Sequence, residues 1–203
     1  MKNNSPKHLL ERIVLDKQMV DEIEMEMLIR RHIERYALVR QYAFGNVLDV
    51  ACGVGYGSYL VAKNPDVNFI QGVDADKESV ELANENFASD KIKFCCDKIE
   101  NITGDFDVLL SLETIEHLPE PKILADLANR CNVKEVIVSF PHKKTTHYNP
   151  YHLWDIEEAD IKFLFKNYEC INKIFNGDST FMHLIMRTKS VNVPKSYLGS
   201  LVK

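Results

Sequence analysis

Two carboxylates and an imidazole lie close together in the segment Glu113-Thr114-Ile115-Glu116-His117. On a helical turn, positions i, i+3 and i+4 share one face, so Glu113, Glu116 and His117 would converge. Like charges at this spacing repel unless a cation lies between them. Such a ligand set suits Mg²⁺ or Mn²⁺ first, and Fe²⁺ or Zn²⁺ second. The competing explanation is that the acids favour a helix N-terminus and that His117 is a packed ring.

A second group of imidazoles lies in the loop 142–154, which carries His142, His147 and His152. His152 would supply a fourth metal ligand if this loop reaches the same site. Without a metal, His147 or His152 is the expected general base, because a hydroxyl acceptor needs a proton acceptor near neutral pH. We expect a cleft in which this loop faces Glu113 and Glu116, with walls from His147, Tyr148, His152 and Trp154. The aromatic rings could equally pack the loop onto the sheet.

Three glycines follow the apolar run 46–51, at Gly53, Gly55 and Gly57. Glycines at a strand-to-helix turn let the backbone approach a ligand closely. Asp49 lies just before this turn, where an anion would repel a phosphate and suit a cationic ligand. Asp74 ends the next apolar run, where a carboxylate can bind both hydroxyls of a ribose. The alternative is a tight turn with a solvated aspartate.

The elements that position these residues alternate between short apolar runs and amphipathic segments. Buried strands are predicted over 46–51, 69–74, 92–96, 106–111 and 135–140. Helices are predicted to end near 64, 88 and 130, and a last one, capped by Asp155, covers 156–167. The runs 170–175 and 181–187 flank the turn sequence Asn-Gly-Asp-Ser and indicate an antiparallel pair.

This order predicts an α/β fold: a Rossmann-like, doubly wound, mostly parallel sheet with an antiparallel C-terminal strand pair and an N-terminal helical cap. We expect the cap over 1–44, with a helical stripe of Val20, Ile23, Met27, Ile33 and Ala37. The ligand-binding domain is expected over 45–190, and 191–203 is expected to be a tail or a partner contact. Ligands bind at the carboxyl ends of the strands in such sheets.

The composition fits a reduced globular protein. The 203 residues carry a net charge of −5, which argues against general attraction to nucleic acid or anionic membranes. No transmembrane span and no signal peptide are predicted. The five cysteines are odd in number and match no zinc spacing, so we expect a cytoplasmic location with buried thiols.

Four segments carry a family resemblance: VLDVACGVGYGS, GVDADKES, CCDKIEN and FDVLLSLETIEHL. Their order and spacing resemble the four successive motifs of the class I S-adenosylmethionine-dependent methyltransferases, from about Gly45 to Arg187. More narrowly, HIERY, VACGVGYGS and SLETIEHL resemble small bacterial methyltransferases of glycan biosynthesis.

The resemblance implies a set of contacts with S-adenosyl-L-methionine. It places Asp49 near the amino group of the methionine part and Asp74 at the ribose hydroxyls. Asp97 would accept from the adenine amino group, although it could also be a helix cap. Arg35 would pair with the cofactor carboxylate. The remaining implied contacts are Ala51, Gly53 and Gly55 in the loop, Ala75, Lys98 and Ile99 near the adenine, and Leu112 after the fourth strand.

The Glu-x-x-Glu-His segment with a later histidine resembles two further groups. These are the metal-dependent 2′-O-methyltransferases of small-RNA 3′ ends and the ubiquinone-pathway O-methyltransferases. His152 in NPYHLWD is the histidine most similar to the later ligand of the first group. The resemblance thus implies a metal held by Glu113, Glu116, His117 and His152.

We therefore expect S-adenosylmethionine-dependent methylation of a hydroxyl on a small acceptor, such as a sugar nucleotide or a glycan unit, because the chain has no separate recognition module. Three alternatives remain: a metal-dependent RNA 2′-O-methyltransferase, a nicotinamide-dependent oxidoreductase, and a non-catalytic partner subunit with the same fold. The net charge disfavours the first. The spacing of the glycines and Asp49 disfavour the second. Homo-oligomerisation is left open.

Overall fold

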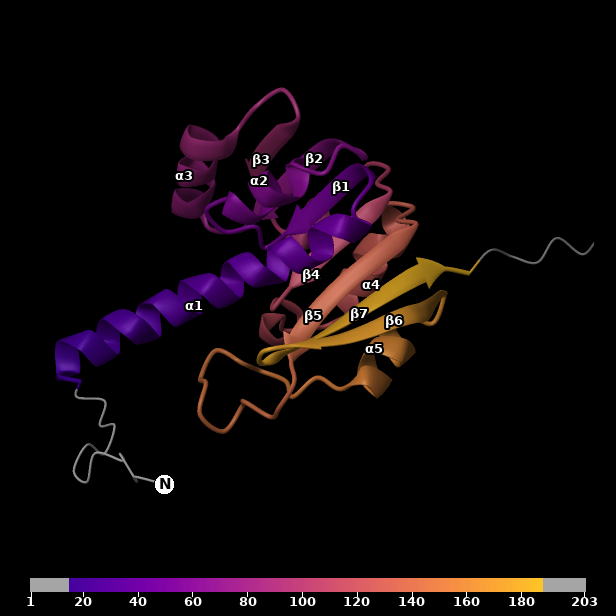
Figure 1. Cartoon of the computed structure of the whole chain (residues 1–203). Coiled ribbons are helices and arrows are strands. Elements are labelled where there is room, and N and C mark those ends of the chain that lie inside the picture. Colours follow the sequence, from indigo (N-terminus) through magenta and orange to yellow (C-terminus); the bar gives the residue numbers. More distant parts are fainter. Residues whose placement is uncertain (1–14, 188–203) are drawn as a thin grey trace, which may run out of the picture.

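The computed structural model describes residues 15–187, which build a seven-stranded sheet with the order β3-β2-β1-β4-β5-β7-β6 (Figure 1). The first five strands run parallel, whereas β7 is antiparallel to both β5 and β6. The strands are β1 (Gly45–Val50), β2 (Val67–Asp74), β3 (Ile92–Cys96), β4 (Val108–Leu112), β5 (Glu135–Pro141), β6 (Tyr168–Asn176) and β7 (Ser179–Met186). The predicted fold class is confirmed.

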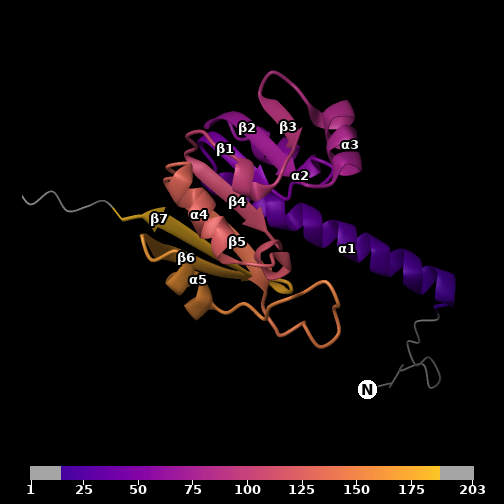
Figure 2. The ribbon, with the colours of Figure 1, turned by 180° about the vertical axis from the view of Figure 1, so that it is seen from behind.

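Helices cover both faces of this sheet (Figures 1 and 2). They are α1 (Lys17–Val39), α2 (Tyr56–Ala62), α3 (Lys77–Phe87), α4 (Lys122–Arg130) and α5 (Glu158–Leu164). The end of α1 packs with α2 and α3 on one face, and α4 and α5 pack on the other. Alternation along β1 explains the two cores, because Val47 faces the first layer while Leu48 and Val50 face the second.

Strand order fixes where a ligand can bind. The chain runs from β1 outward through β2 to β3, and then returns to the other side of β1 for β4 and β5. This reversal opens a crevice at the carboxyl ends of β1 and β4. The turn between β6 and β7 reaches the same edge, because Ser179 pairs with Pro141 at the end of β5.

Two predicted helices differ from the structure. The segment after β4 does not continue as one helix to Arg130: it forms a short 3-10 turn over Ile115–His117, and α4 begins only at Lys122. The continuity breaks at Leu118, whose backbone is extended (ψ 131°) and which is followed by Pro119 and Pro121. The last helix begins at Glu158 rather than at 156, and its N-cap is Glu157 instead of Asp155.

The N-terminal helix also departs from the predicted pattern. Of α1, only Arg35, Tyr36 and Val39 near its end are buried. The expected apolar stripe is not covered by the described chain, since Ile23 is 43% and Met27 50% exposed. Figure 1 shows α1 projecting away from the sheet. The helix therefore covers the domain only through its last turns.

Two further predictions concern membranes and the termini. Within residues 15–187, no helix combines the length and the hydropathy that a bilayer crossing requires. The predicted tail 191–203 lies outside the described residues.

Candidate functional site

The glycine loop lies between β1 and α2 at the crevice. Its backbone enters the left-handed region three times, at Ala51 (φ 56°), Gly53 (φ 54°) and Gly55 (φ 86°). A Cβ on Gly55 would lie 2.8 Å from the Cβ of Ala83 and the Cζ of Phe94, so the loop can pack this closely only with glycine there.

Asp74, at the end of β2, contacts this loop directly. Its Oδ2 accepts a hydrogen bond of 2.8 Å from the backbone N–H of Gly53, and its Oδ1 accepts one of 2.9 Å from Asp76. The half-buried carboxylate thus lies between the ends of β1 and β2. This is the edge at which the sequence predicts a ribose-binding acid. Ala75, the next residue, is exposed at this edge.

Asp49 is fully buried beneath the loop. Ser58 Oγ donates to its Oδ2 over 2.6 Å, and Tyr36 Oη donates to its Oδ1 over 3.3 Å. Burial raises the pKa of Asp49 to about 7, against the lowering effect of these two hydrogen bonds. Sequence reasoning missed Tyr36 and Ser58 as partners of this acid. The signal was present, because both belong to quoted motifs, HIERY and VACGVGYGS.

Asp97 follows β3 and lies just before a 3-10 turn over Ile99–Asn101, whose N-cap is Lys98. Its Oδ1 accepts from the backbone N–H of Lys98 and from Nδ2 of Asn101, each over 2.7 Å. These hydrogen bonds lower the pKa of Asp97. These hydrogen bonds do not make Asp97 a helix cap, since the N-cap of the turn is Lys98 and no side chain caps it. Its contact with an adenine stays a prediction, as do those of Lys98, of the half-buried Ile99 and of Leu112 at the end of β4.

A cavity of about 730 Å³ opens over the ends of β4 and β5. Four parts of the chain form its walls: α1, the segment after β4, the loop after β5 and the β6–β7 turn. The lining residues are Leu28, Arg31, His32, Arg35, Glu113, Glu116, His117, Pro141, His142, Lys143, Thr145, Tyr148, Asn149, His152, Gly177 and Asp178.

The loop after β5 lines this cavity with partly different residues from those that the sequence predicted. Tyr148 and His152 line it, opposite Glu113 and Glu116, but His147 and Trp154 do not. Trp154 instead donates from Nε1 to the carbonyl of Leu118 over 2.9 Å. The prediction that His147 and Trp154 form part of the cavity wall is thus wrong.

Glu116 is the most unusual acid of the cavity. It is fully buried, yet neither carboxylate oxygen has a hydrogen-bond partner within the described chain. Burial raises the pKa of Glu116 to about 8, and the neighbouring charge of Glu113 adds to this effect. A buried carboxylate with two free oxygens is costly unless it is protonated or meets a cation.

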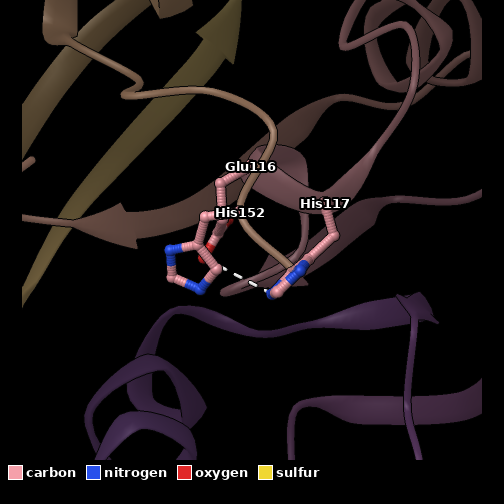
Figure 3. Close-up of side chains that lie close together, drawn as sticks. All are labelled: Glu116, His117 and His152. Atoms are coloured by element: carbon pink, nitrogen blue, oxygen red, sulfur yellow. Dashed lines mark ion pairs between the residues drawn. The ribbon is translucent and has the colours of Figure 1, made fainter. Parts of the chain in front are cut away.

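His117 and His152 face this carboxylate (Figure 3). One ligand atom from each of Glu116, His117 and His152 lies within 4.8 Å of the others. The Nδ1 of His117 must donate to the carbonyl of Tyr151, 2.8 Å away, which leaves its Nε2 as a free acceptor 4.0 Å from Glu116 Oε1. Nδ1 of His152 hydrogen-bonds Thr145 Oγ1.

This donor set fits a divalent cation. Both imidazoles have one ring nitrogen held by the protein and the other free, which is the usual arrangement of metal-binding histidines. The unpartnered oxygens of Glu116 supply the negative charge. Carboxylate oxygen with imidazole nitrogen suits Mn²⁺, Fe²⁺ or Zn²⁺, and Mg²⁺ when water completes its shell.

Glu113 stands apart from this cluster. Its Oε1 accepts from Ser139 Oγ over 2.7 Å, and its Oε2 lies 3.8 Å from Arg35 Nη2. Burial raises the pKa of Glu113, and the charge of Arg35 opposes that shift. The expectation that Glu113 shares a helical face with Glu116 and His117 is wrong, because its left-handed backbone keeps Glu113 outside the 3-10 turn that holds the other two residues.

Arg35 is held by the protein itself. Its Nη2 forms an ion pair of 2.8 Å with Asp178 Oδ1, and its Nε donates to Ser179 Oγ over 2.9 Å. Asp178 also pairs with Arg31 over 3.2 Å. The sequence indicated only a turn at Asp178, since nothing in its surroundings marked a partner on α1. The predicted pairing of Arg35 with a cofactor carboxylate stays a prediction.

The known proteins that this chain resembles are methyltransferases. A family model described as a methyltransferase domain matches residues 44–191. The ubiquinone biosynthesis O-methyltransferase of Saccharomyces cerevisiae is 33% identical over 99 residues, which cover 46% of this chain and 32% of that protein. The enzyme of the same name from Neisseria meningitidis is 28% identical over 128 residues, 58% of this chain and 52% of its own. The chain thus spans about a third to a half of these relatives.

Solved structures share the fold at low identity. Magnesium protoporphyrin IX methyltransferase from Synechocystis superposes with a TM-score of 0.67 at 17% identity, covering 87% of this chain and 90% of that one. A putative methyltransferase from Haloferax volcanii, solved with the Trm112 methyltransferase activator, gives a TM-score of 0.69 at 13% identity, covering 87% and 100%.

Proposed function

The chain belongs to the methyltransferase-domain family, and from this we propose that it transfers the methyl group of S-adenosylmethionine to a hydroxyl of a small acceptor. The observation that carries the proposal is the contact between Asp74 and the glycine loop at Gly53. It supports a ligand that presents ribose hydroxyls to the end of β2 and a cationic centre toward the crevice. The Synechocystis relative was solved with bound SAH, the demethylated form of this cofactor.

In this proposal the cofactor lies along the carboxyl ends of β1 to β4. Ala51, Gly53 and Gly55 offer a close backbone approach to its methionine and ribose parts, and Asp74 binds the ribose. Asp49 lies buried beneath the loop, and its ionised form favours the positive charge of the cofactor. Ala75, Asp97, Lys98, Ile99 and Leu112 are the proposed neighbours of the adenine and of the rest of the cofactor.

The cavity of about 730 Å³ is the proposed acceptor site. It has room for a molecule of the size of a sugar nucleotide or a disaccharide. Arg31, His142 and Lys143 bring positive or titratable groups to its walls. Lys143 has no ion-pair partner within residues 15–187, so it is free to bind an acceptor phosphate. These groups favour a phosphorylated sugar over a neutral glycan.

Glu116, His117 and His152 are the proposed ligands of a divalent metal. When bound, such an ion would lower the pKa of an acceptor hydroxyl as a Lewis acid. Glu113 is left out of this set, because Ser139 and Arg35 occupy its carboxylate. His147 is left out of the mechanism as well, because its ring does not line the cavity.

The transfer itself is an in-line displacement. The acceptor oxygen attacks the methyl carbon, a C–O bond forms, and the S–C bond breaks with its electron pair going to sulfur. S-adenosylhomocysteine leaves as a neutral thioether. Where no metal is bound, the hydroxyl proton passes to His152, because burial lowers the pKa of its ring and leaves it neutral near pH 7. Glu116 is the second candidate acceptor, in its ionised form, which prevails only above its pKa of about 8. Alignment of donor and acceptor supplies much of the rate.

A methyl-transfer screen tests this function. Radiolabelled S-adenosylmethionine is offered with sugar nucleotides, glycan units, phenols and RNA 3′ ends, with and without a chelator. We expect label on a phosphorylated sugar and loss of transfer after chelation. Label on RNA ends alone, or no label on any acceptor while the cofactor binds, would overturn the proposed acceptor class. The comparison of Glu116→Gln with Glu120→Gln, an exposed acid nearby, separates the cavity from general charge effects.

A further inference from the structure

The two-residue turn between β6 and β7, Gly177 and Asp178, contacts α1 beside the cavity. Asn176 pairs with Ser179 across this turn, and the left-handed backbone of Gly177 (φ 60°) allows so short a connection. The backbone N–H of His142, in the loop after β5, donates to the carbonyl of Asp178 over 2.7 Å. The turn is therefore fixed against the sheet edge, and the carboxylate of Asp178 is held with it.

Two arginines of α1 share this carboxylate. Oδ1 of Asp178 lies 2.8 Å from Nη2 of Arg35, and Oδ2 lies 3.2 Å from Nη1 of Arg31. Burial alone would raise the pKa of Asp178, but the charges of Arg35 and Arg31 bring it below its usual value. Asp178 is therefore ionised at neutral pH, and the three side chains together carry one net positive charge.

Arg35 is the member of this trio that the fold holds most firmly. It is only 8% exposed, and besides its pairing with Asp178 it donates from Nε to Ser179 Oγ over 2.9 Å. Within residues 15–187, its Nη1 forms no hydrogen bond, although the side chain lines the cavity. One edge of a fixed guanidinium is thus left for a ligand.

That free edge suits a carboxylate. A guanidinium binds carboxylates through pairs of N–H groups, and the net charge of the trio can be balanced by one further anion. Tyr36, the residue after Arg35, donates to Asp49 beneath the glycine loop, so this part of α1 adjoins the loop. The proposed function places the methionine part of S-adenosylmethionine, with its single carboxylate, along the same loop.

A second acid competes with Asp178 for Arg35. Oε2 of the largely buried Glu113 lies 3.8 Å from the same Nη2 that Asp178 contacts at 2.8 Å. Attraction between charges is strong where water is excluded, so the nearer partner decides where the guanidinium lies. Without the charge of Asp178, we expect Arg35 to turn toward Glu113. Its free edge would then leave the position in which it can meet a carboxylate.

We propose that Asp178 is a positioning residue for the cofactor, which holds Arg35 so that its guanidinium binds the carboxylate of S-adenosylmethionine. This inference rests on the proposed function and adds to the cofactor site a residue from the far end of the domain. Asp178 acts through Arg35 and through the carboxylate of the ligand. A ligand without that carboxylate should therefore not respond to the loss of Asp178.

Calorimetric titration with two ligands tests this dependence. S-adenosylhomocysteine has the carboxylate, and S-adenosyl-3-thiopropylamine is the same molecule without it. Asp178→Asn should weaken binding of the first about 10-fold and change binding of the second by less than about twofold. Asp126→Asn is the matched control, because it also removes an ion pair, with Lys122, from a side chain of equal exposure (50% against 51%). It should bind both ligands like the wild type.

A double-mutant cycle tests the route through Arg35. Arg35→Gln should itself weaken binding of S-adenosylhomocysteine, and adding Asp178→Asn should weaken it no further. Circular dichroism verifies that each variant is folded.

Three results would overturn the proposal. Equal weakening of both ligands in Asp178→Asn would make its role merely structural. Unchanged or tighter binding of S-adenosylhomocysteine in this variant would show that Asp178 only neutralises Arg35. A wild type that binds both ligands equally would show that no group recognises the carboxylate. A wild type that binds neither ligand would instead overturn the proposed function itself.

Discussion

The Nε2 atom of His117 lies 4.0 Å from Oε1 of Glu116, at the bottom of the cavity and next to the ring of His152. The carboxylate of Glu116 is buried and has no hydrogen-bond partner in the described chain, and the Nε2 atom of His117 beside it is free to accept a hydrogen bond. A proton or a cation must occupy the space between such atoms. The balance between these two occupants sets the pH dependence of the site.

We expect divalent cations to bind more tightly as the pH rises. Burial and Glu113 hold the pKa of Glu116 at about 8, so at pH 6 the carboxyl is protonated and a cation must displace that proton. Affinity for Mn²⁺ should therefore increase from pH 6 to pH 8 and level off above it. Calorimetry in two buffers with different ionisation enthalpies should show release of about one proton near pH 7.

Glu116→Gln should lose this binding, whereas Glu120→Gln, which changes an exposed carboxylate after the same turn, should keep it. Mn²⁺ binding that is independent of pH, or that survives in Glu116→Gln, would remove Glu116 from the ligand set.

Glu116 also destabilises the folded protein at alkaline pH. Its pKa is about 8 in the folded chain and about 4.5 when unfolded, so the folded state binds more protons between these values. The free energy of unfolding should therefore fall as the pH rises from about 5 to about 8. Asp49, with its pKa of about 7, contributes to this fall in the same direction.

Glu116→Gln removes one of these two acids. We expect the variant to be more stable than the wild type by a few kcal/mol at pH 8, and equal to it at pH 5. Urea unfolding in the metal-free protein at both pH values measures the difference. A difference between variant and wild type that is the same at pH 5 and pH 8 would show that burial does not raise the pKa of Glu116.

The strands and their order were predictable, because each β-strand of the sheet core is a short apolar run with polar boundaries. The hairpin of β6 and β7 was predictable from Asn176, Gly177 and Asp178 between two such runs. These signals are local. The glycine loop was predictable for the same reason, because a single segment contains both the strand and the spaced glycines that follow it.

The remaining parts of the site depend on distant contacts. The contact of Arg35 with Asp178 joins residues 143 positions apart, and no local pattern marks it. The backbone at Glu113 is left-handed, which a sequence read at helical spacing does not reveal. The stripe on α1 was correctly recognised as helical, but periodicity alone does not tell whether the apolar face meets the chain's own core.

Arg35 should matter more for stability than its place on α1 suggests. Arg35→Gln leaves Glu113 without its guanidinium partner and Asp178 with Arg31 alone, and should lower the free energy of unfolding by about 2 kcal/mol. Arg40→Gln is the matched control, because Arg40 is half-buried but forms no ion pair in the described chain, and it should change stability by less than about 0.5 kcal/mol. Equal losses would show that Arg35 acts through packing alone.

Cofactor binding is the central claim, and calorimetric titration with S-adenosylhomocysteine tests it most directly. The wild type should bind this ligand and not NAD. Asp74→Asn should weaken binding by about 1.5–3 kcal/mol, because the charge-assisted hydrogen bonds to the ribose are lost. The control is Asp76→Asn. Asp76 is the N-cap of the neighbouring helix α3, and because asparagine caps helices as well, this variant should bind S-adenosylhomocysteine like the wild type. No heat with S-adenosylhomocysteine or S-adenosylmethionine, together with binding of NAD, would contradict the account.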